Sequence, residues 1–421
     1  MQAQALVCLR CRARYPVVGM YSGCPACAAA GTPCNLEVEY DPTELARAVG
    51  SIDTADPSMW RYLSLLPVTA EHRTSIGEGG TPLLAAPRLG ARLGLPNLYL
   101  KDESRNPSGS FKDRLAAAAV SAARQQGKSV VVGSSSGNAG AALGALAARG
   151  GLPCVMFTTQ QFPLAMMTQM AVYGSYLVAA PTVKDRWSLM EAGVEQLGWF
   201  PVTVFSYPYF GSNCYGIEGY KTIGYEIVDQ SDVQPDHVVM PVGAGDAFSG
   251  VYKGFREYRD AGVIDVAPTM HAAEVNRPLE HALTNNLDHV TDMPAPAEPS
   301  VAVSVASTLS TYQALNVLRQ TGGEARSAGN AQMLQAQRDL ASLEGIYVET
   351  SSALAVSVLP QLLRENIIDP DARVVAVLTS NGLKDPDTTA AGLPPIPLCG
   401  SDFESALEVL ATSYGYHPIT L

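Results

Sequence analysis

Short apolar runs alternate with longer amphipathic or alanine-rich segments over most of the chain. A buried strand reads as a short continuous apolar run, and a helix reads as a longer segment with polar positions at one face. The predicted strands are residues 98–100, 129–133, 153–157, 175–179, 202–205, 237–241, 269–272, 346–349 and 373–378. Strands of this kind separated by helices such as 138–149 predict an α/β fold with parallel sheets covered on both faces.

Composition narrows the class of protein. The chain has 421 residues, of which 47% are hydrophobic and 16% charged, as expected for a compact fold of more than one domain. A net charge of -12 argues against nucleic acid or an anionic membrane surface as a partner. No apolar run approaches the roughly 20 residues that span a bilayer, and no secretory signal is visible, so we expect a cytoplasmic protein.

Four of the eight cysteines form two pairs near the N-terminus. They are Cys8-x-x-Cys11 and Cys24-x-x-Cys27, with twelve residues between the pairs. Four thiolates satisfy tetrahedral zinc and leave no open position, so the pattern predicts a structural zinc ribbon. Paired disulfides are the alternative, and they fit poorly with a chain that lacks a secretion signal.

A lysine follows the densest turn sequence of the chain. Asn106-Pro-Ser-Gly109 must reverse the backbone, and Ser110 is a candidate cap for the helix that follows. Lys112 then lies in the first helical turn, where the positive helix end favours the neutral amine that a nucleophile needs. The alternative is a solvated lysine at a helix end.

Two further turns lie between a strand and a helix. Residues 134–140 are rich in serine and glycine, and residues 240–250 contain Gly243-Ala-Gly245. Backbone amides at such helix starts bind anions, although either turn could be an ordinary connection. Asp246 would repel a phosphate, so we expect its side chain to turn away and cap the helix.

The run Asn106-Pro-Ser-Gly-Ser-Phe-Lys112-Asp-Arg114 resembles the cofactor lysine motif of threonine synthases, which belong to the fold-type II (tryptophan synthase β) family of pyridoxal-phosphate enzymes. Similar segments at 78–83, 349–353 and 377–385 extend the resemblance over most of residues 79–385. It implies two parallel-sheet domains that close on pyridoxal phosphate, beside the zinc ribbon.

The resemblance also implies roles for individual residues. Lys112 takes the place of the lysine that forms a Schiff base with the cofactor, and Thr379 lies against the pyridine nitrogen. The other residues expected at the cofactor are Asn138, Gly243, Ala244, Gly245, Asp246 and Ala247. The residues expected at the substrate are Ser135, Ser136 and Asn138 at its carboxylate, with Lys101 as the candidate for its phosphate.

We expect the domains to follow the family's division of the chain, and the assembly to be a homodimer. The predicted parts are a zinc ribbon at 1–34, an arm at 35–78, a large cofactor domain at 79–116 and 214–421, and a small substrate domain at 117–213.

The implied reaction is that of threonine synthase, in which O-phosphohomoserine and water give threonine and phosphate. Two departures weaken the match around the substrate: residues 160–169 lack the basic residue that relatives carry, and residues 304–311 lack their "GNP" turn. A β-replacement enzyme that uses phosphoserine, as cysteate synthase does, and a threonine or serine ammonia-lyase are therefore alternatives. A non-catalytic regulatory protein is a third, although it would have no need of a reactive Lys112.

Overall fold

The computed structural model describes residues 1–17, 19–160, 163–206 and 210–417. Two compact units are present, Met1–Asp385 and Pro386–Leu421. The second unit contains α15 (Pro386–Ala390) and α16 (Phe403–Tyr414), and it was expected to belong to the large domain. Among the described residues, every helix is too short or too polar to cross a membrane.

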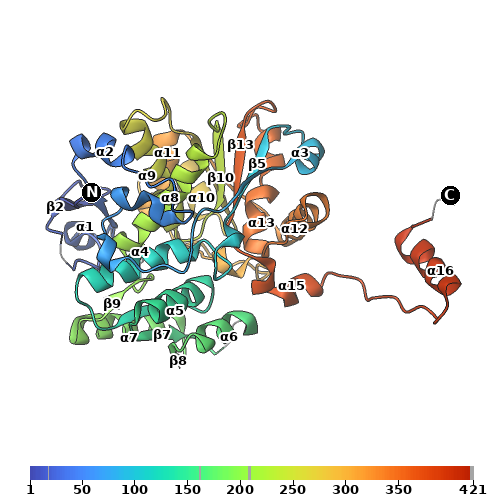
Figure 1. The fold of residues 1–421 in the computed structure, drawn as a ribbon, viewed down its shortest axis with the longest axis horizontal. Helices are drawn as coiled ribbons and strands as arrows, with labels where there is room; N and C mark the ends of the chain where they lie inside the picture. The colour runs from blue at the N-terminus through green and yellow to red at the C-terminus, as the bar shows by residue number, and fades with distance from the viewer. Residues whose placement is uncertain (18, 161–162, 207–209, 418–421) are drawn as a thin grey trace. The chain divides into compact units, whose positions relative to one another are not determined.

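A six-stranded sheet forms the larger half of the first unit, with strand order β12-β11-β10-β13-β5-β4 (Figure 1). All neighbours are parallel except β4, which is antiparallel to β5. Along β13, Val375 and Val377 face one core cluster while Val374, Ala376 and Leu378 face the other, so both faces are covered as predicted. The strands are β4 (Leu83–Ala85), β5 (Leu98–Asp102), β10 (His237–Pro241), β11 (Thr269–Glu274), β12 (Ala325–Ser327) and β13 (Val374–Leu378).

A second, smaller sheet is entirely parallel, with strand order β8-β7-β6-β9. Its helices α5 to α7 cluster around it below the larger sheet in Figure 1. The strands are β6 (Val131–Ser134), β7 (Cys154–Thr158), β8 (Tyr176–Ala179) and β9 (Phe200–Pro201). The helices are α5 (Asn138–Gly150), α6 (Leu164–Val172) and α7 (Val183–Leu197).

Two predicted strands are wrong, and the strands at 5–8, 14–15, 36–39 and 325–327 were missed. The strand predicted at 202–205 is instead β9, assigned to Phe200 and Pro201, and the amide of Val202 still donates to the carbonyl oxygen of Val132 at 2.9 Å. Residues 346–349 form only an isolated bridge at Val348, since Glu349 already caps the next helix, α13 (Thr350–Ser357). The edge strand β12 has the sequence Ala-Arg-Ser, which carries no apolar pattern.

Three long helices pack at backbone contact on one face of the larger sheet: α4 (Lys112–Gln125), α8 (Cys214–Asp229) and α9 (Asp246–Asp260). A side chain at Gly219 would overlap the carbonyl oxygen of Arg114, and one at Gly254 would overlap that of Lys221. The remaining helices of this unit are α1 (Pro25–Ala29), α2 (Pro42–Val49), α3 (Pro87–Leu93), α10 (Pro278–Thr284), α11 (Tyr312–Thr321), α12 (Asn330–Glu344) and α14 (Leu359–Arg364).

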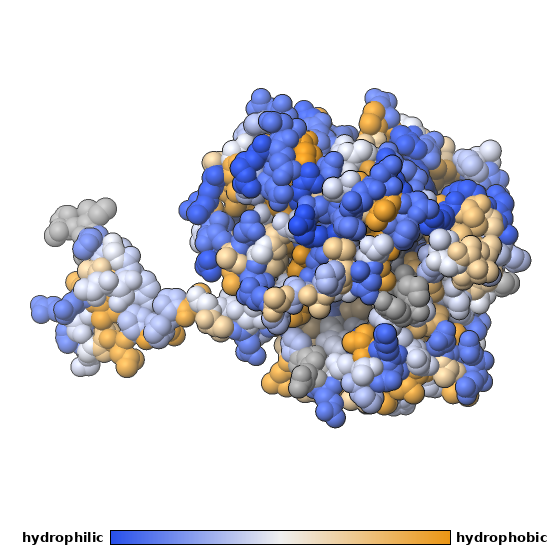
Figure 2. All heavy atoms as spheres, turned by 180° about the vertical axis from the view of Figure 1, so that it is seen from behind, coloured by the Kyte–Doolittle hydropathy of each residue, from blue (hydrophilic) through white to orange (hydrophobic). Residues whose placement is uncertain are grey.

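The N-terminal segment builds a small antiparallel sheet of order β2-β1-β3. Its strands are β1 (Ala5–Cys8), β2 (Arg14–Tyr15) and β3 (Leu36–Glu39). Asn35 donates a hydrogen bond of 3.0 Å from Nδ2 to the carbonyl oxygen of Ser212, so this segment supports the chain that leads into α8. Viewed from behind, the visible surface of the first unit is largely hydrophilic with scattered apolar residues (Figure 2).

Four charged side chains are fully buried where α4, α8 and the end of β5 meet. Arg114 donates two hydrogen bonds of 2.7 Å to each of Glu103 and Glu226. Lys101 Nζ lies 2.7 Å from Glu226. Although burial raises the pKa of Glu226, the two cations hold it below its usual range. The cluster contains two cations and two anions, so it is neutral as a whole.

Removing one cation of the cluster should therefore lower the stability of the folded protein. We expect Lys101→Met to lower the free energy of unfolding by about 3–5 kcal/mol, because it leaves an uncompensated buried charge. Urea unfolding followed by circular dichroism measures the change. Arg47→Met, which breaks an exposed ion pair with Glu44, is the control and should cost less than about 1 kcal/mol. Equal effects of the two substitutions would contradict the role of the cluster.

Candidate active site

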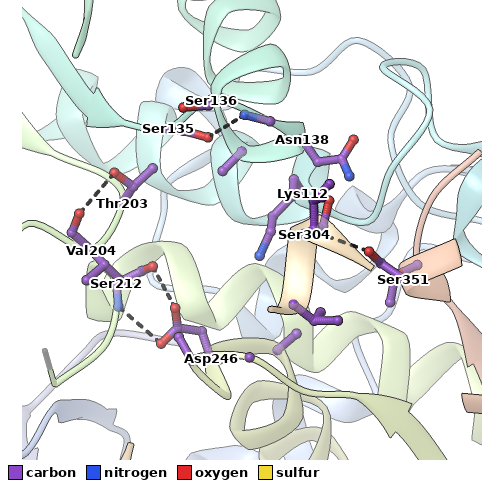
Figure 3. A pocket seen from close by; sticks show the side chains of 18 of the residues that line it. Lys112, Ser135, Ser136, Asn138, Thr203, Val204, Ser212, Asp246, Ser304 and Ser351 are labelled. Atoms are coloured by element: carbon purple, nitrogen blue, oxygen red, sulfur yellow. Dashed lines mark hydrogen bonds between the residues drawn. The ribbon is translucent and has the colours of Figure 1, made fainter. Parts of the chain in front are cut away.

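A cavity of about 570 Å³ receives residues from both sheets of the first unit. The amine of Lys112 points into its centre, with Ser135 and Ser136 at one end and Ser212 and Asp246 at the other (Figure 3). The fold thus brings together Lys112 and both predicted anion-binding turns, although more than a hundred residues separate the lysine from the second turn.

The turn before Lys112 is tied to the end of β13. Phe111 donates its amide to the carbonyl oxygen of Thr379 at 2.9 Å, and Asn381 donates to that of Gly109 at 2.9 Å. Lys112 is the first residue of α4, as predicted. The predicted cap is wrong: Phe111 occupies the cap position, and the Ser110 hydroxyl is buried without a partner among the described residues.

Lys112 lies in an aromatic and apolar environment. Its Nζ donates a 3.0 Å hydrogen bond to the hydroxyl of Tyr220, whose ring stacks on Phe111 at a centroid distance of 5.3 Å. Burial lowers the pKa of Lys112, against the opposing effect of the carboxylates of Asp246 and Glu349. A larger fraction of the amine is therefore neutral and able to act as a nucleophile or base.

The first anion-binding turn opens α5. The Ser135 hydroxyl accepts hydrogen bonds of 3.1 Å from the amides of Gly137 and Gly140, which fixes the turn. Asn138 donates to Glu349 at 3.0 Å. Oδ1 of Asn138 and Oε1 of Glu349 are buried, and neither atom has a hydrogen-bond partner among the described residues. Two orphaned polar atoms beside Lys112 indicate a polar ligand at this place.

The second turn, residues 243–247, presents backbone amides. The carbonyl oxygens of Gly243 and Ala244 accept hydrogen bonds from Ser310 at 2.7 Å and Thr311 at 2.6 Å. Because carbonyl and amide point in opposite directions across a planar peptide, the following amides face away from these hydroxyls. Gly245 has φ of +89°, and it directly precedes the N-terminus of α9, where an anion is favoured.

Asp246 is turned away from the amides of this turn, but it does not cap the helix as predicted. Its carboxylate accepts hydrogen bonds from the amide of Ser212 at 3.1 Å, from the hydroxyl of Ser212 at 2.6 Å and from Gln313 at 2.5 Å. Figure 3 shows the two bonds to Ser212. These three donors satisfy the negative charge that would otherwise oppose a phosphate.

Thr379 lines the cavity at the end of β13. Its hydroxyl lies 2.8 Å from that of Ser352 in α13, within hydrogen-bond distance. A hydroxyl pair here is neutral, as the sequence predicted for the position.

Lys101 does not reach the cavity, so its predicted contact with a substrate phosphate is not supported. Its side chain is fully buried, and it donates to Glu226 at 2.7 Å, to Gln230 at 3.0 Å and to the carbonyl oxygen of Thr81 at 2.6 Å. These partners lie far from Lys101 in the sequence, so no local sequence pattern could predict them.

Several lining residues were not predicted as site residues. Glu349 was named from the sequence only within the motif at 349–353. Residues 304–311 were named only because they lack the "GNP" turn of relatives. The segment 160–169 includes Gln161 and Phe162, which lie outside the described residues. Polar lining residues without a predicted role in the site include Thr159, Arg186, Thr203, Ser212, Ser304, Ser351 and Glu349.

The four N-terminal cysteines converge on one point, separate from the cavity. All Sγ atoms lie within 4.8 Å of one another. The Sγ atoms of Cys8 and Cys27 are 3.6 Å apart, and those of Cys11 and Cys24 are 3.7 Å apart. Thiolates at the corners of a tetrahedron around zinc would be about 3.8 Å apart, given Zn–S bonds of about 2.3 Å.

A family model described as "Pyridoxal-phosphate dependent enzyme" matches residues 74–380. The chain belongs to this family. Pyridoxal phosphate is therefore its cofactor. The threonine synthase of Methanosarcina acetivorans is 34% identical over 91% of this chain and 93% of that protein. The threonine synthase of Methanocaldococcus jannaschii is 35% identical over 84% of this chain and 87% of that protein.

Solved structures confirm the fold. Threonine deaminase isoform 2 from Solanum lycopersicum aligns with a TM-score of 0.63 at 20% identity, covering 85% of this chain and 90% of that one. Maize serine racemase aligns with a TM-score of 0.62 at 18% identity, covering 74% of this chain and 91% of that one.

The residues present fit the cofactor. An aldehyde needs an amine, and Lys112 offers one of lowered pKa inside the cavity. A phosphate needs donors, and residues 243–247 offer amides at a helix start. The polar atoms of a pyridine ring need hydrogen-bond partners. Asn138 and Glu349, which both line the cavity, each have a side-chain oxygen without a hydrogen-bond partner among the described residues.

A methyl group at Gly245 should disturb the amide turn. Its Cβ would lie 2.5 Å from that of Ala314, and the positive φ adds strain. We expect Gly245→Ala to weaken cofactor binding at least about 10-fold, which corresponds to about 1.4 kcal/mol. Titration of the cofactor-free protein with pyridoxal phosphate measures this. Gly262→Ala, at the other end of α9 with φ of +76° and open space, is the control and should bind normally. Unchanged affinity in Gly245→Ala would contradict the assignment.

Proposed function

We propose that this enzyme is a threonine synthase, which converts O-phosphohomoserine and water into threonine and phosphate. The observation that carries the proposal is the position of Lys112 between two separate anion-binding turns, at 134–140 and 243–247. One turn serves the phosphate of the cofactor, and the other serves the anionic groups of an amino acid. The similarity to two archaeal threonine synthases over most of the chain supports the same reaction.

In this proposal the chain's own residues divide the work at the cofactor. Lys112 would hold it covalently, the amides of residues 243–247 would bind its phosphate, and Asn138 and Thr379 would contact its ring; all of them line the cavity. When bound, pyridoxal phosphate withdraws electrons from the carbon that carries the amino group of the substrate. Thr379 is neutral, so it does not hold a proton on the ring as a carboxylate would, which suits elimination more than transamination.

The proton transfers belong to Lys112. Its Nζ would take the proton from the α-carbon of the substrate. Burial keeps the amine partly neutral, and the hydroxyl of Tyr220, 3.0 Å away, holds it in place. Ser135, Ser136 and Asn138, at the start of α5, orient the substrate carboxylate. The positive end of that helix stabilises the carboxylate charge.

Three substrates distinguish the candidate reactions. We expect the purified enzyme with pyridoxal phosphate to form threonine and phosphate in equal amounts from O-phosphohomoserine. Lys112→Ala should lose the yellow colour of the bound cofactor and at least about 10³-fold in rate, because the acid–base group is gone. Phosphate released only from phosphoserine would support β-replacement instead. Ketobutyrate formed from threonine alone would identify an ammonia-lyase, and a protein that stays colourless with added cofactor would not be an enzyme of this kind.

We further propose that Cys8, Cys11, Cys24 and Cys27 bind a structural zinc ion, as their spacing around one point suggests. Reduced thiolates of this kind are typical of the cytoplasm, where we place the protein. The division into a zinc ribbon, an arm, a large cofactor domain and a small substrate domain, and a homodimeric assembly, are proposals that follow from the family.

Metal analysis tests the zinc site. We expect about one zinc per wild-type chain and a loss of that zinc in Cys24→Ser, because a hydroxyl is a poor zinc ligand. Cys399→Ser, an exposed cysteine of the second unit, is the matched control and should retain the metal. Wild-type protein that carries no zinc after purification without chelators would refute the proposal.

A further inference from the structure

One arginine of the cavity has no anionic partner among the residues that the structure describes. Arg186 lies on α7 and lines the cavity together with Lys112. Its Nη1 donates a 2.7 Å hydrogen bond to the hydroxyl of Ser136, and its Nε is buried with no partner among the described residues. Burial lowers its pKa, and no carboxylate acts in the opposite direction. A cation left in this condition favours the binding of an anion.

The acidic residue next to Arg186 on α7, Asp185, already accepts hydrogen bonds within the helix cap. Asp185 accepts hydrogen bonds from the amide of Thr182 at 3.0 Å and from its hydroxyl at 2.8 Å, which forms the cap of α7. Arg114, in contrast, is paired with two glutamates. The charge of Arg186 is therefore directed to the cavity and not to the protein around it.

Hydroxyl groups surround the same point. Ser136 Oγ lies 3.2 Å from the hydroxyl of Thr158 and 3.3 Å from that of Thr159. Thr159 also lines the cavity. A guanidinium with a free N–H beside several hydroxyls matches the donors that a phosphate group requires.

We propose that Arg186 binds the phosphate group of a phosphorylated amino-acid substrate, with Ser136 and Thr159 beside it. This assignment rests on the proposed function in one respect, that the substrate carries a phosphate. Among the described lining residues, Lys112 and Arg186 are the cations, and Lys112 is committed to the cofactor. In the proposed function, the amides of residues 243–247 bind the cofactor phosphate. Arg186 is therefore the remaining cation of the described lining that can bind the substrate phosphate.

Binding to the cofactor-loaded enzyme tests the proposal without turnover. The probes are 2-amino-5-phosphonopentanoate, which resembles O-phosphohomoserine, and norvaline, which has the same carbon chain without the phosphonate. The change in cofactor absorbance on titration gives each Kd. We expect Arg186→Gln to weaken binding of the phosphonate about 10- to 100-fold and of norvaline less than about 3-fold, because a charged hydrogen bond is lost only with the phosphonate.

Further variants control for folding and charge. Arg338→Gln, on the exposed face of α12, removes the same charge away from the cavity and should change neither Kd. Arg186→Lys should recover part of the phosphonate affinity. If Arg186→Gln does not fold, Thr159→Val carries the test, with a several-fold loss for the phosphonate alone. Unchanged phosphonate binding, or equal losses for both probes, would overturn the proposal.

Failure of the proposed reaction has a different signature. A wild-type enzyme that rejects O-phosphohomoserine but binds phosphoserine more tightly than serine would refute the threonine synthase reaction. If Arg186→Gln then removes the preference for phosphoserine, the assignment of Arg186 as the phosphate-binding residue is supported. If the preference persists in the variant, the phosphate site is refuted as well.

Discussion

The position of the reactive lysine depends on the buried charge cluster around Arg114. This arginine lies two residues after Lys112, and its guanidinium binds Glu103 at the end of β5 and Glu226 on α8. Both glutamates are fully buried, so a shift of α4 would leave charges unpaired in a medium of low dielectric. The cluster fixes the start of α4 relative to the larger sheet, and the turn that carries Lys112 spans the distance between them.

The two anion-binding places differ in kind. The turn at 243–247 uses neutral amides and a helix terminus, and its carbonyls are held by Ser310 and Thr311. The place near Ser136 contains the charged guanidinium of Arg186, which we propose as the site of the substrate phosphate. A cofactor bound covalently to Lys112 would not need a strong phosphate site. A substrate phosphate that must be recognised and then leave as product would be held by the charge of Arg186 and the hydroxyls beside it.

Local sequence patterns predicted what local structure determines. Lys112 at a helix start and the two glycine- or serine-rich turns depend on residues close in sequence, and the structure places all three around one cavity. Lys101 could not be placed in this way, because its partner Glu226 lies 125 residues away on a helix that only the tertiary fold brings near. Arg186 was missed for the same reason. On the sequence it is one arginine of a polar helix, and only the fold turns it towards Ser136.

The glycine contacts among α4, α8 and α9 bear on how the enzyme can move. Where a glycine of one helix meets the backbone of the next, the two helices cannot slide past one another without steric overlap, so this side of the cavity resists deformation. The opposite side, built from β6 to β9 and helices α5 to α7, carries Ser135, Ser136 and Arg186. We therefore expect any closure over a substrate to bring the smaller sheet towards Lys112, so that recognition of the substrate and exclusion of water occur in the same motion.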